Sequence, residues 1–143
     1  MLPCGSVRNT NSEEYLMGAD ERMPIVDQLK RCRGWIESAL NYSGGTHDYQ
    51  NVVDGVLSGH MQLWVGEKGC AVTEIVVYPK KKVLHVFLAA GDMEQILDFE
   101  ESAIQFAKMN GCAGMSIAGR PGWQKILGKR GWDVAFVNLS KEF

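Results

Sequence analysis

The sequence lacks the features that mark membrane, secreted or nucleic-acid-binding proteins. Its longest apolar stretches are no longer than a strand, too short for a membrane-spanning helix. Residues 1–5 have neither the basic segment nor the apolar run of a signal peptide. The 15 Lys and Arg against 17 Asp and Glu give a net charge of -2, so no basic field favours a polynucleotide partner. We therefore expect a location in the cytosol, or in a particle assembled there.

Cysteine and histidine are scarce, which argues against a disulfide framework or a metal site. The 4 cysteines are widely separated, with no Cys-x-x-Cys pair and no histidine at ligand spacing beside any of them. We interpret them as reduced thiols and expect no bound metal. The 143 residues suit a single domain with one hydrophobic core.

The first residues are polar and differ from the rest of the chain. Residues 1–23 contain a run of Asn, Thr, Ser and Glu, and they predict a flexible arm that orders against a partner. A short strand at residues 15–17 is the alternative. Residues 24–143 are predicted to form the folded domain.

Two helices are expected before the sheet. Apolar residues recur at three- and four-residue steps from Pro24 to Leu40, and residues 43–45 end that pattern. Thr46 is the expected N-cap of a second helix, whose apolar face continues to Leu57 before Ser58 and Gly59.

A three-stranded meander is predicted next. Its strands cover residues 60–65, 70–78 and 83–89, joined by turns at residues 66–69 and 79–82. The second turn carries three lysines, which we interpret as a solvated turn, with anion binding as the alternative.

The remaining sequence alternates helices and strands. An amphipathic helix is expected over residues 92–109 and a short helix over residues 123–130, with strands at residues 112–118 and 133–139. A β-α-β connection favours a parallel arrangement, so the strand at 112–118 should neighbour the strand at 83–89. The fold class is α/β (α+β), with a mixed, twisted sheet of about five to six strands.

The element order and two short segments resemble the GNAT (acyl-CoA N-acyltransferase) superfamily. Residues 107–112 look like the end of the family's long helix and its next strand, and residues 129–132 look like its Gly-aromatic turn. More narrowly, four segments resemble small GNAT-like proteins of tailed bacteriophages: residues 61–65, 73–75, 89–91 and 119–123. The resemblance implies a GNAT-like fold and, for an active enzyme, acetyl-CoA as cofactor.

Two positions depart from the family pattern. The family holds the CoA pyrophosphate on a Gln/Arg-x-x-Gly-x-Gly/Ala loop, because glycine lets phosphates approach backbone N–H groups at a helix start. Here only Gly91 matches, and Asp92 and Glu94 lie where the phosphates would be. The tyrosine that protonates the leaving thiolate in many members corresponds to Leu127, which cannot donate a proton. The cofactor contacts that the resemblance implies are Ala89, Ala90, Gly91 and Ser116.

Few titratable side chains remain for catalysis. Glu74 and His85 are expected to face each other on neighbouring strands, where they would serve as a general base for an amine. The alternative is a solvated glutamate and a structural histidine. Ser116 lacks a His-Asp context in the sequence, so nucleophilic catalysis is not predicted.

The turn at residues 119–122 offers one further candidate site. Arg120 and Trp123 would contact an anion or a partner there. The alternative is that Trp123, Trp132 and Phe136 close one end of the core.

Two hypotheses of function follow. In the first, the chain is a non-catalytic interaction module with a protein partner, either phage structural proteins or further copies of itself, and it binds no cofactor. In the second, it transfers an acetyl group from acetyl-CoA to an amine. The acidic loop and Leu127 favour the first hypothesis, and the fold favours the second.

Overall fold

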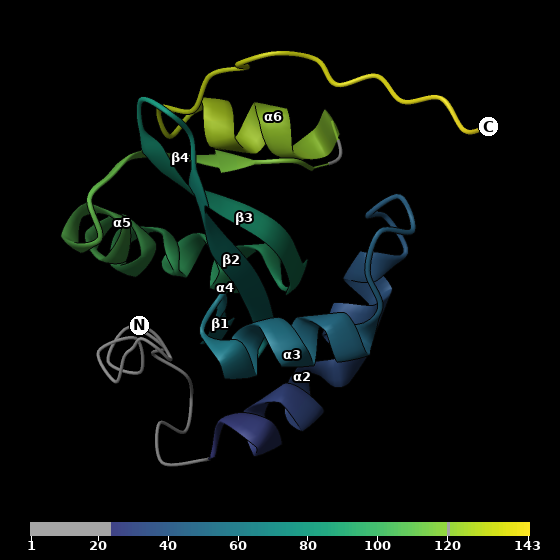
Figure 1. Ribbon diagram of the computed structural model, residues 1–143. Coiled ribbons are helices and arrows are strands. Elements are labelled where there is room, and N and C mark those ends of the chain that lie inside the picture. Colours follow the sequence, from purple (N-terminus) through teal and green to yellow (C-terminus); the bar gives the residue numbers. More distant parts are fainter. Residues whose placement is uncertain (1–23, 120) are drawn as a thin grey trace.

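The computed structural model describes residues 24–119 and 121–143, which form one sheet with helices on both of its faces (Figure 1). The helices are α2 (Ile25–Leu40), α3 (Tyr49–Ser58), α4 (Met93–Asp98), α5 (Glu100–Met109) and α6 (Pro121–Gly128). The strands are β1 (Met61–Val65), β2 (Gly69–Val77), β3 (Lys82–Gly91) and β4 (Cys112–Ile117). The predicted arm at residues 1–23 and the alternative strand at 15–17 lie outside the described residues.

The sheet has the strand order β1-β2-β3-β4. The first three strands are antiparallel, and β4 runs parallel to β3, as the β-α-β connection predicted. Both predicted turns are closed by backbone hydrogen bonds: the Gly66 N–H donates to the Gly69 carbonyl at 2.9 Å, and the Tyr78 N–H to the Lys81 carbonyl at 2.8 Å. The meander is therefore confirmed.

The first sheet face packs against α2 and α3, which lie together on one side of the sheet (Figure 1). Aliphatic side chains and two thiols from both layers form this core, and they are almost fully buried: Leu29, Cys32, Ile36, Val52, Val56, Leu63, Val65, Cys70, Val72 and Leu88. The two predicted N-terminal helices therefore cover one face of the sheet, over strands β1, β2 and β3.

The opposite face packs against α4 and α5. Trp64 and Leu84 from the sheet meet Phe99, Ala103 and Phe106, and the rings of Trp64 and Phe106 are edge to face at 5.8 Å. Aromatic pairs in this geometry add stability beyond the area that they bury.

A polar relay also lies on this face. The Trp64 indole N–H donates to Thr73 Oγ1 at 3.0 Å, and that hydroxyl donates to Gln62 Oε1 at 2.9 Å. All three residues are buried. The hydrogen bonds offset the free-energy cost of taking their polar groups out of water.

The helix expected over residues 92–109 is two helices that meet at Phe99. The Phe99 N–H bonds to the Ile96 carbonyl, three residues back, which is the tight turn of a helix end. The Phe99 side chain is buried in the second core, beside Ala103 and Phe106. The predicted N-cap was also wrong: Asp48, not Thr46, caps α3 and forms a capping box with Asn51.

The final strand expected at residues 133–139 is absent from the described structure, and the prediction of five to six strands is not confirmed. Residues 133–143 have no regular secondary structure and are exposed throughout. A strand needs a neighbouring backbone, and the described residues provide none for this segment. Phe136 is 80% exposed and does not close the core.

Candidate functional site

Three predicted site residues lie side by side across β2, β3 and β4. Glu74 pairs with His85 in the β2–β3 register, and His85 pairs with Ser116 in the β3–β4 register. The expected facing of Glu74 and His85 is therefore confirmed. His85 Nδ1 and Ser116 Oγ are 2.9 Å apart and hydrogen-bonded. The sequence did not indicate this contact, because 31 residues separate the two positions.

The environment of His85 keeps its ring neutral. Burial lowers the pKa of His85, and the negative charge of Glu74 opposes that shift only in part. A histidine with a lowered pKa is unprotonated at pH 7. A neutral imidazole within hydrogen-bond reach of a hydroxyl has the geometry of a general base. The pair is thus chemically competent to remove a proton.

This row of residues lies on the face that carries α2 and α3. Glu74 is also paired with Met61, whose side chain belongs to the first core, and directly paired residues share a face. Further along β3, Phe87 contacts the His47 ring from the α2–α3 loop, with 4.6 Å between ring centroids. The side chains of Glu74, His85 and Ser116 are half-buried rather than enclosed.

The implied cofactor positions lie where β3 continues past its pairing with β4. The β3–β4 register ends at Val86 and Ile117, whereas β3 runs on to Gly91. Ala89, Ala90 and Gly91 are paired with β2 alone among the described strands. Pairing between the two parallel strands therefore stops at Val86, because β4 itself ends at Ile117.

The loop that follows β3 is packed against the β1–β2 turn. Gly91 has φ +109°, and a Cβ there would collide with the backbone of Lys68 and Gly69. The Asp92 N–H donates to the Lys68 carbonyl at 2.8 Å, and the Lys68 N–H donates to Gln95 Oε1 at 3.3 Å. These contacts fill the space beside Gly91.

The start of α4 is capped by its own carboxylate. Asp92 Oδ1 accepts the Glu94 N–H at 3.1 Å. An anion at a helix start would seek the same backbone donors. At about 4 Å in a water-like dielectric, each of the two carboxylates opposes a bound phosphate by about 1 kcal/mol. The residues present do not fit a pyrophosphate held in the family's usual way.

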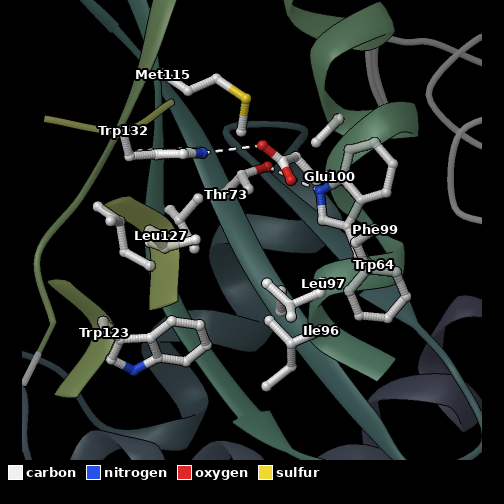
Figure 2. Close-up of a pocket in the computed structure, with 14 residues that line it drawn as sticks. Trp64, Thr73, Ile96, Leu97, Phe99, Glu100, Met115, Trp123, Leu127 and Trp132 are labelled. Carbon is white, nitrogen blue, oxygen red and sulfur yellow. Dashed lines mark hydrogen bonds between the residues drawn. The ribbon is translucent and has the colours of Figure 1, made fainter. Parts of the chain in front are cut away.

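A narrow apolar cavity lies between the sheet and α4, α5 and α6 (Figure 2). Its volume is about 60 Å³, and its walls include Trp123, Leu127, Trp132 and Met115. Leu127 is buried, so the position of the family tyrosine carries an apolar packing residue here. The cavity has room for little more than water.

Glu100 is the one charged side chain among the described residues of the cavity wall, and its charge is already paired. Its carboxylate accepts two hydrogen bonds, one from Nε1–H of Trp132 at 2.9 Å and one from Nε–H of Arg130 at 2.6 Å. Figure 2 shows the bond from Trp132. Burial raises the pKa of Glu100, but these bonds and the Arg130 charge outweigh it, so the pKa lies below its usual range. From the sequence, Glu100 was expected only to lie within the helix over residues 92–109, a position that carries no information about Trp132.

Of the two residues expected to contact an anion or a partner, Arg120 lies outside the described residues. Trp123 lines the apolar cavity, and its ring packs close to Gly119. Trp123 and Trp132 therefore line the same cavity, whereas Phe136, the third residue of the alternative, is 80% exposed.

Within residues 24–119 and 121–143, no group of three or more His, Cys, Asp or Glu side chains is placed to hold a metal ion. No helix in these ranges is both long enough and apolar enough to span a bilayer.

Several solved structures share the fold at low sequence identity. A Thermus thermophilus protein, TTHA1254 in its wild-type form, has a TM-score of 0.57 at 15% identity, over 82% of this chain and 91% of the other. A possible acetyltransferase from Clostridium difficile has 0.58 at 10%, over 82% and 91%. A Trypanosoma brucei acetyltransferase has 0.54 at 11%, over 80% and 94%.

No family model and no curated protein matches the sequence. Likeness at this identity establishes fold and leaves activity open. The chain has an α+β GNAT-like fold, built on a four-stranded mixed sheet in its described residues.

Proposed function

We propose that this chain uses a GNAT-like fold as a non-catalytic interaction module: a virion-associated, assembly or host-interaction protein of a tailed bacteriophage. The phage context is supported by the four short segments that resemble small phage proteins. The non-catalytic role is supported by the loop between β3 and α4.

The observation that carries the proposal is the bond from the Glu94 N–H to the Asp92 carboxylate. In an acyltransferase of this fold, backbone donors at that helix start would face the cofactor phosphates. Here the Asp92 carboxylate accepts a hydrogen bond from one of these donors, the Glu94 N–H. Gly91 is packed against Lys68 and Gly69. A chain that has lost this cradle keeps a rigid body suited to binding another protein.

Calorimetric titration with acetyl-CoA tests the proposal. We expect only heats of dilution, even at high ligand concentration. Micromolar binding to the unaltered chain would overturn the proposal. The double variant Asp92→Asn, Glu94→Gln tests whether the two negative charges are what prevents binding. It keeps the helix cap, because asparagine also caps helices. Removing two charges worth about 1 kcal/mol each should strengthen any residual phosphate binding by about thirtyfold.

The second candidate function is acetyl transfer from acetyl-CoA to an amine. The row of Glu74, His85 and Ser116 favours it, since a neutral His85 beside a polar partner would accept a proton from an amine. The loop at Gly91 and Asp92 opposes it.

Acetylation of an amine library distinguishes the two functions. An enzyme would lose activity on His85→Gln and keep it on His60→Gln, a change at an exposed histidine. Activity with that pattern would establish the second function over the first.

A further inference from the structure

Two exposed features of the described chain lack a structural neighbour. The first is the outer edge of β4, which is the last strand of the sheet and pairs only with β3 among the described residues. Its Ala113 and Gly114 are exposed. Alternate residues of a strand direct their N–H and C=O groups to each side, so six residues offer about three of each along this edge. Open edges of this kind readily accept another strand.

The second feature is the extended segment 133–143, which runs past α6 and away from the sheet (Figure 1). It carries large apolar side chains that are 59–117% exposed: Val134, Phe136, Val137, Leu139 and Phe143. Valine and phenylalanine favour strands. An apolar, strand-forming segment in water indicates a surface that another chain covers.

The beginning of this segment is fixed. The Trp132 N–H donates to the Leu127 carbonyl at 3.1 Å, and its indole N–H donates to Glu100. Gly131 has φ +90°, which turns the chain out of α6. The segment therefore leaves the body of the domain from a defined point, with its apolar residues presented outward.

We propose that residues 133–139 of one copy add as a strand to the outer edge of β4 in a second copy, and that the exchange is reciprocal. Each copy has one strand to give and one exposed edge to fill, because the other outer strand, β1, is buried over its whole length. A twofold dimer satisfies both at once and leaves neither edge open. This inference rests on the proposed interaction function and names its partner as a second copy.

The lengths of the two elements support the pairing. The edge strand β4 has six residues, and the segment 133–139 is of comparable length, so one can pair along the whole of the other. Added main-chain hydrogen bonds would supply affinity, and the exposed Phe136 and Leu139 would supply packing.

Sedimentation velocity of the purified full chain over a wide concentration range tests the proposal. We expect a concentration-dependent dimer. The double variant Phe136→Lys, Leu139→Lys should weaken it by about tenfold or more, because charge opposes strand addition. Val77→Lys is the matched control, since Val77 is 71% exposed on β2 and should not affect the dimer.

The edge is tested separately with Gly114→Lys. A Cβ at Gly114 meets no atom within 4 Å, so the fold tolerates the side chain, while a lysine at an edge blocks pairing. The control is Gly34→Lys on α2, which has equally open space. Each variant should melt near the parent temperature, and Gly114→Lys alone of these two should abolish the dimer.

Amide hydrogen exchange distinguishes strand pairing between two copies from strand pairing within one copy. We expect amides of residues 133–139 to be protected only at concentrations where the dimer forms. Protection in a monomer, or a dimer that survives both the Phe136/Leu139 and Gly114 variants, would overturn the inference. A monomer at every concentration would also overturn it, yet would leave the acetyl-CoA result and the proposed interaction function untouched.

Discussion

The indole N–H of Trp132 donates a 2.9 Å hydrogen bond to Oε2 of Glu100. Trp132 follows α6 and Glu100 begins α5, so this bond joins the last helix to the helix pair on the second sheet face. Arg130 donates to the other oxygen of the same carboxylate. One acidic side chain therefore holds the end of the domain in place.

Replacing this carboxylate should loosen the C-terminal end. We expect Glu100→Ala to lower the free energy of unfolding by about 2 kcal/mol, because two charge-assisted hydrogen bonds are lost and the Trp132 N–H is left without its acceptor. Glu101→Ala, at the exposed neighbouring position in the same helical turn, should change it little. Urea unfolding measures both, and equal effects would refute the assigned role.

The Glu100 carboxylate should also make the free energy of unfolding depend on pH. Its pKa is lowered in the folded state, so the unfolded chain takes up a proton first as the pH falls. The stabilisation is complete above the unfolded pKa of about 4.3 and is lost as the pH falls through the folded pKa. The stability difference between the parent and Glu100→Ala should therefore shrink below about pH 4. A difference independent of pH would contradict this.

Gly91 and Gly131 form a matched pair for testing the packing at the loop. Both have positive φ, at +109° and +90°, but only Gly91 has backbone in the place of a Cβ. Gly131→Ala should cost about 1 kcal/mol from backbone strain alone. Gly91→Ala should cost about 3 kcal/mol or more, because Lys68 and Gly69 must also move. Similar losses in thermal or urea unfolding would mean that the loop is not packed as described.

The buried relay around Thr73 gives a fourth test. Thr73→Val keeps the shape but removes the hydroxyl that accepts from Trp64 and donates to Gln62. Two buried polar groups lose their partner, so we expect a loss of about 2 kcal/mol. Thr46→Val, at an exposed threonine, is the control. Retained stability in Thr73→Val would show that water or another group replaces the hydroxyl.

Periodic patterns predicted the fold well where each element had a local cause. The spacing of Leu29, Cys32 and Ile36 placed α2, and the turns at 66–69 and 79–82 placed the meander. The break at Phe99 was missed, because Phe99 keeps helical backbone angles and packs into the second core, a tertiary contact that no local pattern encodes. The strand at 133–139 failed for a related reason: its residues favour a strand, but pairing depends on a neighbour.

The candidate site was predicted less completely than the fold. Facing of Glu74 and His85 follows from strand pairing, so it could be read from the meander. The contact between His85 and Ser116 depends on the β3–β4 register, which no turn length fixes in a parallel crossover. The closure of the Gly91 loop against Lys68 lies in the β2–β3 pair, but its register depends on the irregularity between Val72 and Thr73, which no local pattern indicated.

The lowered pKa of His85 gives the last prediction. Burial favours the neutral ring in the folded state, so the unfolded chain binds the proton more readily. Stability from this site is present above the unfolded pKa of about 6.5 and is lost as the pH falls towards the folded pKa. The parent should therefore lose stability between about pH 7 and 5, and His85→Gln should remove part of that loss. His60→Gln, at an exposed histidine, should leave the slope unchanged.

Urea unfolding at several pH values measures this slope, and NMR titration of the ring reports His85 directly. If His85→Gln keeps the full slope, the ring is not held neutral by the fold. Its pKa would then lie near the ordinary value of about 6.5, and a larger share of His85 would be protonated, and so unable to act as a base beside Ser116, as the pH falls below about 7. The same experiment thus decides whether the fold itself keeps His85 neutral in the row across β2, β3 and β4, whichever of the two functions the chain performs.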